Sequence, residues 1–191
     1  MSACGYVGRS HTFVCYVTNA RADAGFAGQL VLSTVDLASG AESPWAALPV
    51  AVAAGPGAMA WLSPTAPLPN ATTTLLLARL EGAGGALIEE HLVHLTAPVN
   101  LLVPRATLAS SVAASPNADG SANITVSSDA AALFVTLTSA APGRFSDNAF
   151  LVLPSAPRLV VWLPFVAGDA EADLALLRSS LRVEDYSMYA A

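Results

Sequence analysis

Short stretches in which apolar and polar residues alternate recur along the chain, separated by Gly, Pro, Asn and Ser. In residues 122–127, Ile124 and Val126 share one face, while Asn, Thr and Ser residues share the other. Residues 133–138 alternate in the same way, with Leu133, Val135 and Leu137 on one face. A strand with one buried face and one wet face has this period of two, so the pattern predicts antiparallel sheets.

The same criteria predict strands along most of the chain, at residues 12–18, 29–37, 58–62, 73–80, 86–95, 99–104, 122–128, 133–138, 149–153, 158–165 and 180–185. Residues 159–163 are apolar without alternation, which suits a central strand covered on both faces, or one against a neighbouring domain. Helix is scarce: residues 170–178 predict about two turns, with Asp169 as the N-cap. Short strands at this spacing are typical of an all-β sandwich.

The length of 191 residues suits one large domain or two small ones. We predict two tandem immunoglobulin-like antiparallel β-sandwiches, at residues 1–97 and 98–191, with at most one short helix. Residues 110–120 are predicted to form a loop inside the second domain.

Composition excludes several classes of protein. Hydrophobic residues make up 54% of the chain and charged residues 12%, which is too apolar for intrinsic disorder. The net charge is −6 and every basic residue is arginine, so the chain lacks the basic patch that binds nucleic acid or anionic membranes. The most apolar window, residues 45–62, is broken by Pro49, Gly55, Pro56 and Gly57, so we predict no membrane-spanning helix.

Candidate catalytic residues are few. Glu89 and Glu90 are adjacent glutamates, but neighbouring residues of a strand point to opposite faces, so they are predicted to be solvated residues of an edge strand. His91 and His94 are likewise predicted on opposite faces of one strand, as surface or hydrogen-bonded core histidines. The glycine-rich residues 82–85 lack the lysine of a phosphate loop and predict a hairpin turn. We predict no metal and no cofactor.

Cysteines and sequons leave alternatives open. Cys4 and Cys15 form either a disulfide or two free thiols, with Cys15 buried in a strand. Asn70 and Asn123 begin Asn-x-Thr triplets and are candidate glycosylation sites if the protein enters the secretory pathway.

Exposed aromatic residues would suit sugar stacking, and the chain has three tryptophans. Trp162 is predicted in the core. Trp45, which follows Ser43-Pro44, is the best candidate for exposure, although packing is the commoner role of a large aromatic residue.

One segment resembles a known family. Its matching residues are Pro142, Gly143, Arg144, Phe145, Ser146, Asp147, Asn148, Phe150 and Leu151, then the run Val161, Trp162, Leu163, Pro164 and Phe165, and a closing strand, Leu181 to Val183, near Tyr186. This order resembles the last domain of β-mannosidases, glycoside hydrolases of the β-galactosidase and β-glucuronidase clan. The resemblance covers about residues 133–189, whereas residues 1–100 match only as a generic sandwich.

The resemblance implies a β-sandwich that follows a catalytic barrel in a retaining enzyme acting on terminal non-reducing β-D-mannose. The family's catalytic acid follows an asparagine, and no asparagine here precedes a glutamate, so the chain alone is expected to be inactive. Implied partners are the parent's catalytic barrel and carbohydrate. A lysosomal, vacuolar or extracellular location is implied if the parent resembles eukaryotic β-mannosidases. The alternative function is a stand-alone carbohydrate-binding or interaction module.

Within the motif, Phe145 and Phe150 differ in register, so a bulge or tight turn at Asp147 and Asn148 is needed to bury both. Arg144 is expected to pair with Asp147 across that turn. The family usually has glycine where this chain has Ala149, and a positive φ there would cost alanine about 1 kcal/mol. We expect a structural role for the motif, the alternative being that Asp147 or Asn148 contacts the parent's substrate.

Overall fold

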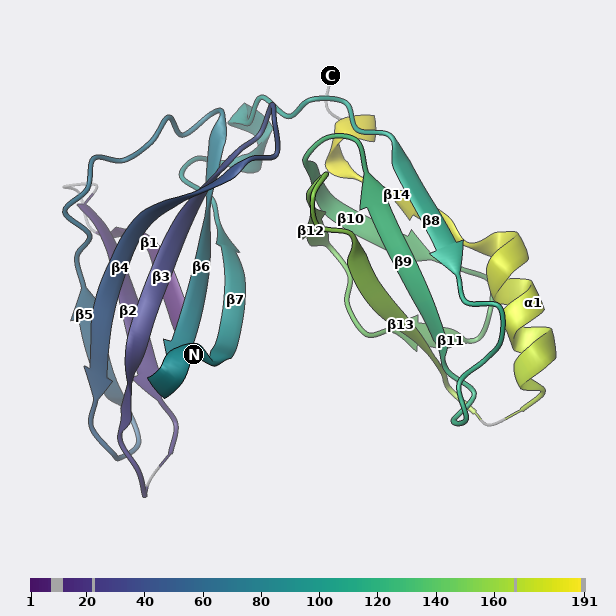
Figure 1. Cartoon of the computed structure of the whole chain (residues 1–191), viewed down its shortest axis with the longest axis horizontal. Coiled ribbons are helices and arrows are strands. Elements are labelled where there is room, and N and C mark those ends of the chain that lie inside the picture. The colour runs from purple at the N-terminus through teal and green to yellow at the C-terminus, as the bar shows by residue number, and fades with distance from the viewer. Residues whose placement is uncertain (8–11, 22, 167, 190–191) are drawn as a thin grey trace. The chain divides into compact units, whose positions relative to one another are not determined.

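The computed structural model describes residues 1–7, 12–21, 23–166 and 168–189 and divides the chain into two compact units (Figure 1). Unit 1 comprises Met1–Asp36 and Ala41–Leu102, and unit 2 comprises Leu37–Gly40 and Val103–Ala191. Each unit contains one three-stranded and one four-stranded sheet, and every described strand pair is antiparallel. The prediction of an all-β fold built from sandwiches is therefore confirmed.

Unit 1 contains the first seven strands. The three-stranded sheet has the order β1-β2-β5, and its members are β1 (Ser2–Val7), β2 (Thr12–Asn19) and β5 (Ala58–Leu62). The four-stranded sheet has the order β4-β3-β6-β7, and its members are β4 (Glu42–Val52), β3 (Phe26–Asp36), β6 (Thr74–Gly82) and β7 (Leu87–Val93). The turn η1 (Ala83–Gly85) joins β6 to β7, which confirms the predicted hairpin.

The core of unit 1 follows from strand alternation. In β2, Phe13, Cys15 and Val17 are buried and the residues between them are not. They pack with Leu30 and Leu32 of β3 and with buried residues of β4, β6 and β7. A disulfide joins Cys4 to Cys15, which lie directly opposite each other in β1 and β2, so the first of the two alternatives for the cysteines is correct.

Unit 2 contains the remaining strands and a helix. Its three-stranded sheet has the order β12-β10-β14, with β12 (Phe150–Val152), β10 (Ala132–Thr138) and β14 (Arg182–Glu184). Its four-stranded sheet has the order β11-β13-β9-β8, with β11 (Gly143–Phe145), β13 (Arg158–Pro164), β9 (Ala122–Ser128) and β8 (Leu108–Val112). The helix α1 spans Ala170–Ser180 and is followed by the 3-10 turn η3 (Tyr186–Met188), whereas the 3-10 turn η2 (Pro98–Asn100) belongs to unit 1.

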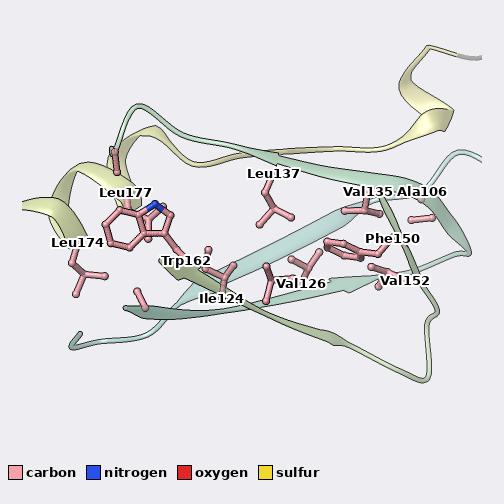
Figure 2. Close-up of a cluster of buried hydrophobic side chains, with 14 residues drawn as sticks. Ala106, Ile124, Val126, Val135, Leu137, Phe150, Val152, Trp162, Leu174 and Leu177 are labelled. Carbon is pink, nitrogen blue, oxygen red and sulfur yellow. The ribbon is translucent and has the colours of Figure 1, made fainter. Parts of the chain in front are cut away.

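The core of unit 2 lies between its two sheets (Figure 2). Trp162 is 1% exposed, as predicted, and it contributes a large side chain at one end of this core. Leu174 and Leu177 of α1 pack into the same end, where they cover what the strands leave open. The carboxylate of Asp169 accepts a hydrogen bond from the amide N–H of Ala172 at 3.1 Å, which confirms the predicted N-cap.

The predicted strands at 58–62 and 122–128 are confirmed residue for residue. The strand predicted at 99–104 is wrong, because η2 begins at Pro98 and no strand follows it until β8. The loop predicted at residues 110–120 begins later than expected, because residues 110–112 belong to strand β8, which ends at Val112. Strand β13 is central, as expected, but it is not covered on both faces, since Leu159 is 61% exposed.

The structure also contains strands that the pattern did not predict, namely β1, β4, β8 and β11. Strand β4 contains Pro44 and Pro49, and prolines argue against a strand when only the sequence is known. Its place at the edge of the sheet explains the tolerance, because an edge strand leaves one row of backbone groups unpaired.

Candidate functional site

The motif at residues 142–150 forms a corner between the two sheets of unit 2. Strand β11 pairs with β13, so that Phe145 lies opposite Trp162, and β12 pairs with β10, so that Phe150 lies opposite Val135. Phe150 is buried in the core and Phe145 packs against its margin. The turn between them lets residues of different register reach one core, as the sequence predicted.

Polar side chains of the turn bond to the domain itself. The side-chain oxygen of Asn148 accepts from the Leu137 amide N–H at 2.8 Å, and its side-chain nitrogen donates to the Leu137 carbonyl at 3.2 Å. The amide group of Asn148 therefore replaces a strand residue beside β10. The hydroxyl of Ser146 accepts from the Val161 N–H at 2.9 Å, which extends the pairing with β13.

The expected ion pair between Arg144 and Asp147 is wrong. Asp147 instead accepts a hydrogen bond from the guanidinium of Arg158 at 3.0 Å, and its other oxygen accepts from the Asn148 N–H at 2.8 Å. Arg158 also lies over the ring of Phe150, with 5.9 Å from its guanidinium carbon to the ring centroid. Arg144 is exposed on β11, since its neighbours on that strand face the core.

Backbone geometry explains two small residues of the motif. Ala149 has a φ of +61°, in the left-handed region that favours glycine. A Cβ atom on Gly143 would lie 2.4 Å from the indole nitrogen of Trp162 and 2.6 Å from the Leu163 carbonyl oxygen. Gly143 is therefore required by the close approach of the Trp162 ring, whose buried N–H has no hydrogen-bond partner in the described part of the chain.

The tryptophans of unit 1 differ from the prediction. Trp45 is half-buried, donates from its indole nitrogen to the Pro67 carbonyl at 3.0 Å and packs edge-on against Phe13, so its selection as the exposed tryptophan is wrong. Trp61 is 61% exposed and lies 5.5 Å from the ring of Tyr16, with an angle of 50° between the rings. We call this pair the Tyr16–Trp61 surface. Residues 58, 60 and 62 of β5 pack against the core, so the alternation of this strand could have predicted that Trp61 is exposed.

Small and apolar residues surround the Tyr16–Trp61 surface on the outer side of the β1-β2-β5 sheet. Ala3 lies opposite Tyr16, and Gly5 has open space where a side chain would begin. Met59, two residues before Trp61, is 44% exposed. The indole ring is thus accessible, and this outer face offers apolar area without a neighbouring charge among these residues.

The adjacent glutamates point to opposite faces of edge strand β7, as predicted. Glu89 accepts a hydrogen bond from the Ser2 N–H at 2.8 Å, whereas Glu90 accepts one from Arg79 at 2.8 Å. Arg79 also holds Glu42 through two hydrogen bonds, which lower the pKa of Glu42 and raise the pKa of Arg79. Both carboxylates near Arg79 are therefore bound to one guanidinium in salt bridges, unlike the acid and nucleophile of a glycosidase.

His91 lies in β7 and His94 just beyond its end, so the two histidines do not share one strand. Both ring nitrogens of His91 are buried without a hydrogen-bond partner among the residues described, which contradicts a hydrogen-bonded core histidine. Burial lowers the pKa of both histidines, and for His91 the nearby Glu89 opposes the effect. Neutral imidazoles are the expected form at pH 7.

The remaining candidate positions are separated from one another. Asn70 is exposed, and its side-chain oxygen accepts from the Thr72 N–H at 3.0 Å and the Thr72 hydroxyl at 2.9 Å. Asn123 is half-buried in the inner strand β9. Within the described ranges no group of His, Cys, Asp and Glu side chains is arranged to hold a metal ion, and no helix there is long and apolar enough to cross a membrane.

Comparisons with known proteins agree with this architecture. Residues 103–190 match the sequence profile of the family Ig_mannosidase, described as an Ig-fold domain. Among solved structures, a β-D-mannosidase from Dictyoglomus thermophilum matches with a TM-score of 0.67 and 16% identity over 97% of this chain and 21% of its own. The exo-chitosanase CsxA from Amycolatopsis orientalis matches with a TM-score of 0.57 and 14% identity over 97% of this chain and 25% of its own. A search of the curated proteins finds no match.

The fold and these matches define unit 2 as an Ig-like β-sandwich of the kind found in glycoside hydrolases. Residues 103–190 match the Ig_mannosidase family model, which confirms the resemblance of the C-terminal segment to the last domain of β-mannosidases. The chain spans only about a fifth to a quarter of the solved proteins it matches.

Proposed function

We propose that this chain is a non-catalytic β-sandwich region of a β-mannosidase-like glycoside hydrolase, whose catalytic barrel is its main partner. The observation that carries the proposal is the family match of residues 103–190, together with a solved β-D-mannosidase whose fold this chain follows over 97% of its length. The parent activity we propose is hydrolysis of terminal non-reducing β-D-mannose. The pairing of Glu42 and Glu90 with Arg79 supports the absence of catalysis in this chain.

We propose that the motif residues from Pro142 to Asn148, with Phe150 and Trp162, hold the corner of unit 2 and do not contact substrate. The bonds of Asn148 to Leu137 support this role. Asn148→Ala would leave both backbone groups of Leu137 unpaired and is expected to destabilise unit 2 by about 2–3 kcal/mol. Asp147→Asn, at a solvent-exposed ion pair, is expected to cost less than about 1 kcal/mol. Equal effects of the two changes would contradict this assignment.

The test of the proposed function is an assay with p-nitrophenyl β-D-mannoside and p-nitrophenyl β-D-glucosaminide. The purified chain is expected to give no turnover above buffer, because a retaining glycosidase needs two carboxylates about 5–5.5 Å apart. A variant with both Glu42→Gln and Glu90→Gln is the matched control. Turnover by the chain that this variant lacks would contradict the proposal.

A carbohydrate-binding role is the second candidate, and the Tyr16–Trp61 surface is the observation that favours it. A pyranose ring can stack its C–H face on an exposed indole, and Trp61 is 61% exposed. Titration with manno-oligosaccharides, followed by tryptophan fluorescence, tests this role. Binding should be lost in Trp61→Ala and kept in Met59→Ala, which removes a neighbouring exposed side chain of the same strand. An unchanged tryptophan emission spectrum at a high concentration of mannohexaose would count against a carbohydrate-binding role.

A further inference from the structure

Unit 2 has an open groove on the outer side of its three-stranded sheet, which we call the β10–η3 groove. It is lined by Phe134, Thr136, Glu184, Asp185, Tyr186 and Tyr189, and its volume is about 320 Å³. The lining residues come from β10, from the end of β14 and from η3 with the residues on either side of it. This volume is at the lower end of the range of ligand sites, so the groove can admit a small organic ligand.

Three of the six residues that line the groove are aromatic. Phe134 and Tyr186 meet edge to face, with 6.2 Å between ring centroids and an angle of 76°. Tyr189 is 72% exposed, so its ring can adjust to a ligand at the mouth of the groove. Three rings around one open volume present several electron-rich faces to whatever enters it.

The backbone at Phe134 holds its ring in this position. Phe134 has a φ of +52°, which is rare for a bulky residue, and it lies where the pairing of β10 with β12 shifts register between Ala132 and Val135. The buried neighbours Leu133 and Val135 are 0% exposed, while Phe134 turns its ring to the outer side and into the groove. The ring of Phe134 thus lies on the outer face with Thr136, as the alternation of residues 133–138 predicts, and the register shift lies directly beside it.

The charge of the groove is negative. Its lining residues include the two carboxylates of Glu184 and Asp185 and no cationic side chain. Asp185 is 2% exposed and accepts hydrogen bonds from the N–H and hydroxyl of Ser187, which hold its carboxyl group in place. Glu184 pairs with Arg182 at 2.6 Å, but Arg182 is 72% exposed and the pair is weak enough for a competing cation to displace it.

We propose that the β10–η3 groove binds a small organic cation that carries an ammonium group. Aromatic faces attract a cation through their quadrupoles, and the carboxylate of Glu184 supplies the opposite charge, so both parts of the lining favour the same ligand. A neutral ligand of the same shape would cover a carboxylate without providing a counter-charge, which costs desolvation energy. The groove belongs to unit 2, whereas the Tyr16–Trp61 surface belongs to unit 1, and the proposal does not depend on the proposed function.

The experiment is an NMR titration of the ¹⁵N-labelled full chain with tetramethylammonium chloride, at constant ionic strength. tert-Butanol is the neutral probe of similar shape, and sodium chloride is the control for the anion. Tetramethylammonium is expected to shift the amide signals of Phe134, Thr136 and Tyr186, with a Kd on the order of millimolar. Binding of tert-butanol with equal affinity would overturn the proposal. So would the absence of any amide shift at a tetramethylammonium concentration of about 100 times the expected Kd.

Matched variants assign the binding to the groove. Glu184→Gln keeps the shape and removes the charge, and it is expected to weaken tetramethylammonium binding at least about fivefold. Tyr189→Ala removes an exposed ring of the groove and is expected to weaken it about threefold or more. Glu171→Gln on α1 and Phe165→Ala, which removes a ring that is 68% exposed, are the controls and should leave the Kd unchanged. An unchanged Kd in Glu184→Gln would overturn the proposal.

Discussion

Ala149→Gly is expected to stabilise unit 2, although glycine usually weakens a folded chain. Ala149 has a φ of +61°, and the left-handed region costs a residue with a Cβ atom about 1–2 kcal/mol. Glycine removes this cost, but it also raises the conformational entropy of the unfolded chain, which lowers the stability by about 0.4–1 kcal/mol. Ala149 is exposed, so loss of its methyl group removes no buried contact. The expected net gain in the free energy of unfolding is about 0.5–1 kcal/mol.

Equilibrium unfolding in urea measures this gain. Tryptophan fluorescence reports on unit 2 alone in a background that carries Trp45→Phe and Trp61→Phe, because Trp162 is then the remaining tryptophan. The urea concentration at the midpoint of unfolding should rise by roughly 0.3–1 M, while the dependence of the free energy of unfolding on urea concentration stays the same. The melting temperature of unit 2 should rise by about 2–8 °C.

Ala109→Gly is the matched control. Ala109 is exposed in strand β8 and has no positive φ, so glycine there should lower the free energy of unfolding by about 0.5–1 kcal/mol. A rise in the free energy of unfolding for Ala149→Gly together with a fall for Ala109→Gly would indicate an effect of the backbone conformation. If Ala149→Gly destabilises unit 2 as much as Ala109→Gly does, the reasoning from the positive φ is refuted.

Three further predictions concern packing, the disulfide and pH. Gly143→Ala should destabilise unit 2 by about 1–3 kcal/mol in urea unfolding, because the new methyl group would clash with the ring of Trp162. Reduction of the bridge between Cys4 and Cys15, 11 residues apart, should cost unit 1 about 3 kcal/mol and leave the fluorescence transition of unit 2 unchanged. Burial lowers the pKa of His91 below 6.5 in the folded state, so the unfolded state takes up a proton at higher pH than the folded state does. The melting temperature of unit 1 should therefore fall as the pH drops below about 6.5, and it should fall less in His91→Gln.

Each of these predictions has a clear opposite outcome. Gly5→Ala, where a Cβ atom meets open space, is the control for Gly143→Ala, and equal effects would mean that the ring contact is unimportant. A loss of unit 2 stability on reduction would contradict the assignment of the bridge to unit 1. A melting temperature of His91→Gln that falls with acid as steeply as that of the unchanged chain would exclude His91 as the titrating group.

The alternating pattern predicted much of the fold, because antiparallel strands with one buried face leave a period of two in the sequence. The strand at 122–128 and the cap at Asp169 are examples. Strand β4 was missed because its prolines are tolerated only at a sheet edge, and edge position is a property of the whole sheet. Strand β11 is three residues long, too short to show a period.

The candidate sites were less predictable. The partner of Asp147 is Arg158, eleven residues away, and the sequence alone favoured the nearer Arg144. The exposure of Trp61 could have been found from the alternation of β5. The outward position of Phe134 follows from the alternation of residues 133–138, but the groove beside it does not, because its other wall comes from η3, far away in the sequence.

The central claim is that this sandwich chain is part of a β-mannosidase-like hydrolase. Sequencing of the full-length transcript that contains its reading frame tests the claim most directly. We predict that the frame is continuous with an upstream barrel domain that contains an Asn-Glu pair at its catalytic acid. An in-frame stop codon directly before Met1, in a transcript that encodes no barrel, would contradict the claim.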